Sequence, residues 1–240
     1  MPLNLYSPPE FELPHPPLSI ALLLIVEDAI RVAWKILIEH PPTGFDMLTA
    51  VEGTINHHLR ETLQDCVWDR GLVDGFDALQ VACINSAEEV RDYSGRELQK
   101  KPDMIVKLVG MPANARPSQY GIFIECKPVD KNHTPVKHYC GFGIERFVDG
   151  SYAWAMQEGM MIGYIAGDDD PVETLSVALQ KCQENTLPIG KPAFCPRSVP
   201  EDNMRTVVTR HSRSFSYVET NIKAPEILLR HVWLKRENKN

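Results

Sequence analysis

Two runs of apolar residues, at positions 104–110 and 120–127, form the most distinctive part of the hydrophobic pattern of this chain. Both runs are almost continuous, which is typical of strands that are covered on both faces of a sheet. Polar residues stand at their ends: Asp103 directly precedes the first run, and Glu125 and Lys127 close the second. The pattern therefore predicts two buried strands that bring three polar side chains to their ends.

Alternate side chains of a strand share a face, so Glu125 and Lys127 are expected to point to one side and Cys126 to the other. A carboxylate and an ammonium at the end of a buried strand are costly unless they are paired or bind something. Asp103, arriving from a neighbouring strand, would complete a pair of carboxylates. Two carboxylates with open coordination positions suit Mg²⁺ or Mn²⁺, and a nearby lysine can hold a metal-bound water or neutralise a phosphate.

The remaining pattern predicts an α/β protein. Apolar residues spaced three and four apart, or an acidic cap, predict helices at 19–40, 46–68, 149–158 (capped by Gly159) and 171–183 (capped by residues 168–170). Short apolar or β-branched runs predict further strands at 79–84, 160–166, 206–209, 214–218 and 226–235. Proline-rich or polar stretches predict an N-terminal arm at 1–17 and loops at 127–143 and 184–203.

We expect a single globular domain in three parts. An arm and a helix (1–43) lead into a core (44–167), and a C-terminal helix with a β-rich extension (168–240) packs on that core. The domain is large enough to bury a substantial core, because 43% of its 240 residues are hydrophobic.

Charge and cysteine content limit the possible partners and compartment. The net charge of −7 argues against wholesale electrostatic binding of nucleic acid, although residues 205–240 carry eight Lys or Arg against three acids. The six cysteines form no CxxC pair, the first 17 residues show no secretory pattern, and the apolar run at 19–26 is too short to span a bilayer. These features predict a soluble cytoplasmic protein.

Two polar features of the second helix are open to two interpretations. Glu52 lies at the edge of the apolar stripe, where a carboxylate either belongs to the helix surface or is aimed into a site. His57 and Glu61 are spaced i, i+4 and could share a metal. Because the pattern offers no third ligand, a solvated pair is favoured there.

The pair Pro102-Asp103, followed after 21 residues by Glu125-Cys126-Lys127, resembles the signature of the PD-(D/E)XK nuclease superfamily. That superfamily has a restriction-endonuclease-like α-β-β-β-α-β core. The helices and strands expected between residues 46 and 166 follow the same order if 79–84 is the first core strand. The resemblance therefore implies this fold for the core of the chain.

The same resemblance implies roles for individual residues. Asp103 and Glu125 would be metal ligands together with the backbone carbonyl of Cys126, and Lys127 would be the catalytic lysine. Glu52 would be the acid of the first core helix. Mg²⁺ or Mn²⁺ is the implied cofactor.

Five residues are candidates for contacts with nucleic acid. Lys137 and His138 lie in the loop after the motif, Gln157 lies on the expected helix that follows, and Arg210 and Arg213 lie in the basic C-terminal segment. Each has an ordinary alternative, because the loop can simply be solvated and the C-terminal segment can be a β-element that completes the core.

The sequence thus predicts a Mg²⁺-dependent nuclease that hydrolyses phosphodiester bonds, with DNA as the favoured substrate. One alternative is a catalytically silent nucleic-acid-binding or assembly subunit on the same fold, and another is a structural protein in which Glu125 and Lys127 form a surface ion pair. A small nuclease without a visible recognition domain is associated with prokaryotic antiviral defence or mobile elements. Its specificity would come from loops, from a homodimer or from a partner protein.

Overall fold

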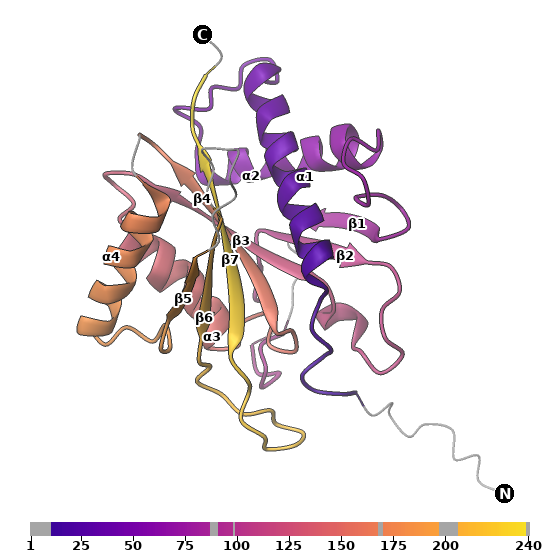
Figure 1. The fold of residues 1–240 in the computed structure, drawn as a ribbon, viewed down its shortest axis with the longest axis vertical. Coiled ribbons are helices and arrows are strands. Elements are labelled where there is room, and N and C mark those ends of the chain that lie inside the picture. Colours follow the sequence, from indigo (N-terminus) through magenta and orange to yellow (C-terminus); the bar gives the residue numbers. More distant parts are fainter. Residues whose placement is uncertain (1–10, 87–90, 98, 168–169, 197–205, 239–240) are drawn as a thin grey trace, which may run out of the picture.

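One seven-stranded mixed sheet organises the chain, with its strands in the order β1-β2-β3-β4-β7-β6-β5 (Figure 1). The structure, a computed structural model, describes residues 11–86, 91–97, 99–167, 170–196 and 206–238. The strands are β1 (Val81–Ser86), β2 (Met104–Leu108), β3 (Ile122–Val129), β4 (Glu158–Ile165), β5 (Ala193–Pro196), β6 (Thr206–His211) and β7 (Ile227–Lys235). The predicted α/β class is confirmed.

The first three strands form an antiparallel meander, and β4 then pairs with β3 in parallel. β7 lies beside β4 in parallel, and β6 and β5 continue the sheet in antiparallel pairs. β4 is buried at all of its positions because it has a strand on each edge and helices on both faces. The C-terminal strands therefore extend the same sheet that the first four strands begin.

Helices cover both faces of this sheet. They are α1 (Ile20–Glu39), α2 (Glu52–Glu61), the π-helical η1 (Thr62–Trp68) and η3 (Pro135–Ile144), the short η2 (Pro117–Gln119), α3 (Glu145–Val148) and α4 (Pro171–Glu184). Neighbouring residues of β4 identify the two faces. Tyr164 stacks on Trp34 of α1 with ring centroids 5.4 Å apart, whereas Gly163 faces Tyr139 of η3. Figure 1 accordingly shows α1 and α2 on one side of the sheet and α3 and α4 on the other.

Two helices begin where their capping residues predict. The side chain of Ser19 accepts a hydrogen bond from the amide of Leu22 at 3.2 Å, and α1 starts at the next residue. Asp170 accepts hydrogen bonds from the amides of Val172 and Glu173, which confirms its capping role at α4. Among the described residues, no helix is both long enough and apolar enough to cross a membrane.

The predicted helix at 149–158 is wrong, and so is the predicted loop at 127–143. The helical segment is η3 followed by α3, and residues 149–157 form turns. The glycines of this segment suggested a loop, but they allow close packing. A Cβ on Gly143 would lie 2.5 Å from Cε of Met161, so any larger residue would displace the end of the Met161 side chain from between η3 and β4. Gly159 caps no helix; it lies in β4, where Phe147 covers it.

Other boundaries also shift. The second helix begins at Glu52 and not at residue 46, because residues 46–49 form a turn in which Asp46 accepts hydrogen bonds from Leu48 and Thr49. The strand at 79–84 is confirmed as β1, two residues further along. No strand forms at 214–218 apart from an isolated bridge at Ser216, and the predicted loop at 184–203 contains β5. Residues 197–203 of that loop, and the capping residues 168 and 169, lie outside the described residues.

The described part of the N-terminal arm lies against the domain. The amide of His15 donates to the carbonyl of Ala155 at 2.8 Å, and the amide of Glu12 donates to the carbonyl of Asn114 at 3.0 Å. The side chain of Gln157 donates to the carbonyl of His15 at 2.8 Å. Gln157, a candidate for nucleic-acid contact, therefore holds the arm in place.

Candidate metal centre

Three polar side chains meet where β2 and β3 stop pairing. The last paired residues at this end are Met104 of β2 and Ile124 of β3. Asp103 directly precedes β2, and Glu125 and Lys127 follow Ile124 along β3. Because no further ladder joins the strands here, their polar side chains can converge without interrupting the sheet.

The ammonium of Lys127 is the centre of this group. Its Nζ lies 2.8 Å from Oε1 of Glu125, 2.9 Å from Oε1 of Glu52 and 3.6 Å from Oδ2 of Asp103. It also donates to the backbone carbonyl of Cys126 at 2.8 Å. We call Glu52, Asp103, Glu125 and Lys127 the acidic cluster.

Both backbone polar groups of Cys126 are hydrogen-bonded within the cluster. Its amide donates to Oδ2 of Asp103 at 2.7 Å, and its carbonyl accepts from Lys127. The side chain of Cys126 is fully buried in the core, as the strand alternation predicts. Asp103 and the carbonyl of Cys126, both expected as metal ligands, are thereby fixed beside each other.

Glu52 enters the cluster from the first residue of α2. A carboxylate is favoured at this position because the start of a helix carries partial positive charge. Its side chain is 31% exposed, so it lies at the rim of the cluster. Burial raises the pKa of Glu52, against the opposing effect of Lys127. Of the two interpretations left open by the sequence, the structure therefore favours the one in which Glu52 is aimed into the site.

Glu125 is the most buried carboxylate of the cluster. Burial, together with the nearby charge of Asp103, raises the pKa of Glu125 to about 7, although Lys127 opposes this shift. Its Oε2 and the hydroxyl of nearby Tyr152 are both buried and make no hydrogen bond of standard geometry among the described residues, although the two side chains lie close enough for Tyr152 to lower the pKa of Glu125 slightly. Burial alone would lower the pKa of Lys127, but Glu125, Asp103 and Glu52 together raise it above its usual value.

The cluster fits a hard divalent cation. Its three carboxylates outnumber the single ammonium, so additional positive charge would balance it. The buried Oε2 of Glu125, which has only a poorly aligned contact with Tyr152, is an oxygen that a cation could satisfy, and every other donor atom of the set is also oxygen. Mg²⁺ and Mn²⁺ prefer such ligands, and they keep some of their waters.

The five candidates for contact with nucleic acid lie in different surroundings. Lys137 is exposed on η3, and His138 on the same segment is half-buried with its ring edge-on to Phe142. Arg210 is exposed on β6, three strands from β3, where it lies 3.7 Å from Glu226. None of these three belongs to the acidic cluster.

The predicted contact of Arg213 with nucleic acid is wrong. Its side chain is only 3% exposed, and its guanidinium donates to the carbonyls of Trp154 and Met156. A buried arginine that satisfies backbone carbonyls has no free face for phosphate. Arg213 therefore holds the turns between α3 and β4 in place.

Sequence reasoning missed one pair beside the cluster. Oδ1 of Asp130, directly after β3, lies 2.9 Å from Nδ1 of His133. Burial raises the pKa of Glu52, and His133 is one of the groups whose smaller electrostatic effect opposes that rise, so this histidine lies near the cluster. An acid followed three residues later by a histidine, just beyond the ExK strand, is the signal that could have identified the pair.

Comparisons of the chain with protein-family models, curated proteins and solved structures find no match. A functional proposal must therefore be argued from the motif, the topology and the chemistry of the acidic cluster.

Proposed function

We propose that this chain is a divalent-metal-dependent nuclease with a restriction-endonuclease-like core of the PD-(D/E)XK type. The observation that carries the proposal is the contact of Lys127 with Glu52, Asp103 and Glu125, which come from separate parts of the chain. The order α2-β1-β2-β3-α3-β4, with β4 parallel to β3, supports it because this is the element order of that superfamily.

Asp103, Glu125, Glu52 and the carbonyl of Cys126 are the groups that would hold Mg²⁺ or Mn²⁺. Such an ion, when bound, lowers the pKa of a coordinated water and stabilises negative charge on the phosphate. Lys127 shares these oxygens, so its ammonium would give up part of its present contacts and donate to the attacking water or to the phosphate. Water adds to phosphorus and a P–O ester bond breaks, leaving one phosphate end and one hydroxyl end.

We propose DNA as the substrate. With a net charge of −7, the chain must attract a polyanion through local groups and not through its overall charge. Exposed Lys137, on the segment that follows β3, is one such cation. Lys137 would bind a phosphate outside the cluster and leave the chemistry to the four cluster residues.

Cleavage assays with matched variants test the proposal. Plasmid, single-stranded DNA and RNA are incubated with the wild type, Asp103→Asn and Lys127→Met, in Mg²⁺, Mn²⁺ or EDTA. We expect metal-dependent DNA cleavage that falls by about 10²–10³-fold in both variants. Lys35→Met is the control, because Lys35 is 74% exposed on α1 and pairs only weakly with Glu39.

Equal cleavage by the wild type and the two cluster variants would contradict the site. Binding of DNA without cleavage of any substrate would favour the silent-subunit alternative. Preferential cleavage of RNA would keep the site and replace the substrate.

A further inference from the structure

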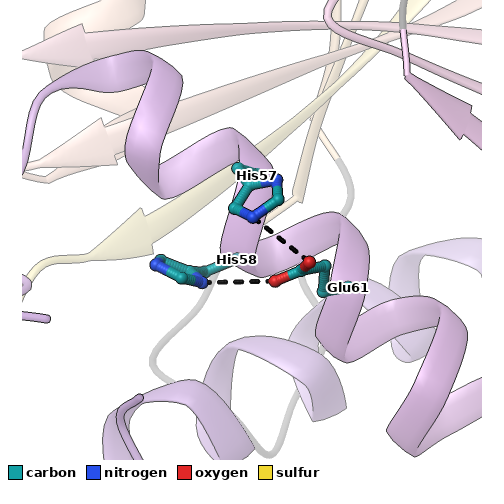
Figure 2. A group of neighbouring side chains, drawn as sticks. All are labelled: His57, His58 and Glu61. Atoms are coloured by element: carbon teal, nitrogen blue, oxygen red, sulfur yellow. Dashed lines mark ion pairs between the residues drawn. The ribbon is translucent and has the colours of Figure 1, made fainter. Parts of the chain in front are cut away.

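A second group of side chains of the types that bind metals lies at the C-terminal end of α2. Figure 2 shows His57 and His58 both directed toward Glu61. Nε2 of His57 lies 3.1 Å from Oε1 of Glu61, and Nδ1 of His58 lies 3.4 Å from Oε2 of the same carboxylate. One ligand atom from each residue lies within 4.8 Å of the other two, so the three donors are already gathered.

Packing holds the ring of His58 in place. The side chain is half-buried, and its ring meets the ring of Phe45 edge-on with centroids 4.7 Å apart. A side chain that is already fixed loses little further conformational freedom when it binds a ligand. His58 therefore supplies, in a prepared orientation, the third ligand that the pair His57 and Glu61 lacked in the sequence pattern.

Hydrogen bonding assigns the proton of His57. Nη2 of Arg60 lies 3.2 Å from Nδ1 of His57, and a guanidinium can only donate. Nδ1 must therefore accept, which leaves the proton on Nε2, where it is donated to Glu61. For Nε2 to bind a metal, the proton must move to Nδ1 and Arg60 must turn away, so Arg60 opposes metal binding.

We propose that His57, His58 and Glu61 form a second metal site, which takes a borderline-soft divalent cation such as Zn²⁺. Two imidazole nitrogens and one carboxylate oxygen are a common three-ligand set for such ions and leave coordination positions open. Mg²⁺ is a poor fit because it prefers oxygen ligands. His58 and Glu61 also line an open groove of about 330 Å³ together with Asp65 and Cys66, so the open positions are accessible to water or a small anion.

This site is separate from the acidic cluster although both use α2. Glu52 is the first residue of the helix and Glu61 the last, roughly 13 Å apart along its axis at the usual rise per residue. The inference therefore does not rest on the proposed nuclease function. All three ligands lie in α2, whose last residue is Glu61, so the site needs no residue of π-helical η1.

Titration calorimetry with Zn²⁺ tests the proposal. The full chain carrying Asp103→Asn and Glu125→Gln is used in excess Mg²⁺, so that the acidic cluster does not contribute. We expect one Zn²⁺ per chain, with binding at least about tenfold weaker in His58→Gln and in Glu61→Gln. We expect tighter binding in Arg60→Gln, because the opposing guanidinium is gone.

His133→Gln is the matched control. Like His58, His133 pairs with an acid, here Asp130, and its ring lies near the ring of a second histidine, His138. Unchanged affinity in this variant is expected. Absence of Zn²⁺ binding, equal affinity in the parent and His58→Gln, or loss of binding only in His133→Gln would overturn the proposal. The side chains substituted in the Zn²⁺-binding variants and in the control are at least partly exposed, and circular dichroism verifies that the parent, in which buried Glu125 is replaced, and each variant are folded.

Discussion

The hydroxyl of Tyr139 lies 3.0 Å from Nδ1 of His231, and this contact fixes the proton positions of a buried chain of hydrogen bonds. Trp233 donates its indole N–H to the Tyr139 oxygen at 3.2 Å, so the Tyr139 proton is free to be donated to His231. Nε2 of His231 then carries the ring proton and donates to the Thr209 hydroxyl at 2.6 Å.

The chain continues in the same direction to a carbonyl. Thr209 donates to Nε2 of His211 at 2.7 Å, and Nδ1 of His211 donates to the carbonyl of Ile189 at 2.7 Å. Burial keeps both histidines neutral by lowering the pKa of each ring. With neutral rings, an indole that can only donate and a carbonyl that can only accept, the hydrogen bonds between them all run in this direction, and protonation of either ring would break one of them.

Acid should consequently unfold the protein through these histidines. Burial lowers the pKa of His211 from 6.5 to about 4, and it also lowers the pKa of His231 well below 6.5. The unfolded chain binds these protons below about pH 6.5 and the folded chain does not, so stability is lost as the pH falls from 6.5 toward 4. The expected loss is about 3 kcal/mol from His211 alone at the acid end of that window.

Urea denaturation of the wild type and His211→Gln at several pH values measures this effect. The variant is less stable at pH 7 but loses less stability on acidification, because it lacks one of the titrating groups. Equal acid dependence of the two proteins would show that His211 does not titrate as described.

Removal of the Lys127 ammonium should destabilise the metal-free protein. Lys127→Met leaves Glu52, Asp103 and Glu125 facing one another without a counter-charge. The expected cost is about 2 kcal/mol, reduced from that of a fully buried pair because Glu52 is partly exposed. Thermal melts with and without Mg²⁺ measure the change, and Mg²⁺ should stabilise the variant more than it stabilises the wild type.

Two glycines should respond to alanine with opposite signs. A Cβ on Gly159 would lie 2.6 Å from Phe147 and 3.1 Å from Leu229, so Gly159→Ala should lower stability by about 1–3 kcal/mol. Gly53, in α2, has nothing within 4 Å of its added Cβ, so Gly53→Ala should raise stability by about 0.5–1 kcal/mol. Denaturant midpoints of both variants give the comparison, and a stable Gly159→Ala protein would contradict the packing of Phe147 on β4.

Substitution of two arginines from the same basic segment, Arg210 and Arg213, should have very different effects on stability. Arg213→Met leaves the carbonyls of Trp154 and Met156 without the guanidinium and should cost about 2–4 kcal/mol. Arg210→Met removes only an exposed ion pair with Glu226 and should change stability by less than about 0.5 kcal/mol. Chemical denaturation of the two variants measures the difference. Similar values for both would mean that Arg213 is not holding the turns.

The core strands were predictable because burial on both faces leaves a continuous apolar run. The polar interruptions at Asp103, Glu125 and Lys127 were equally visible, since a buried strand tolerates them only when they meet partners. Glu52 could not be placed from its helix alone, because its contact with Lys127 depends on how α2 docks on the sheet. The local sequence pattern of α2 does not predict this long-range docking.

The errors have local physical causes. The segment from Pro135 to Ile144 is π-helical, so its buried side chains do not follow the ordinary helical period, and its glycines suggest a loop. Arg213 looked like a surface cation because burial of a guanidinium against backbone carbonyls leaves no trace in the sequence. His58 was overlooked because adjacency to His57 hides that both rings reach the same carboxylate.

The position of β7 determines what happens to a chain that lacks this strand. β7 follows the other strands in sequence but separates β4 from β6 in the sheet. Until residues 227–235 are in place, β4 presents one unpaired edge along a strand whose residues are otherwise all buried. Such an edge is a template for pairing with other chains. Truncation before Ile227, or proteolysis between β6 and β7, should therefore produce aggregates and not a smaller folded domain.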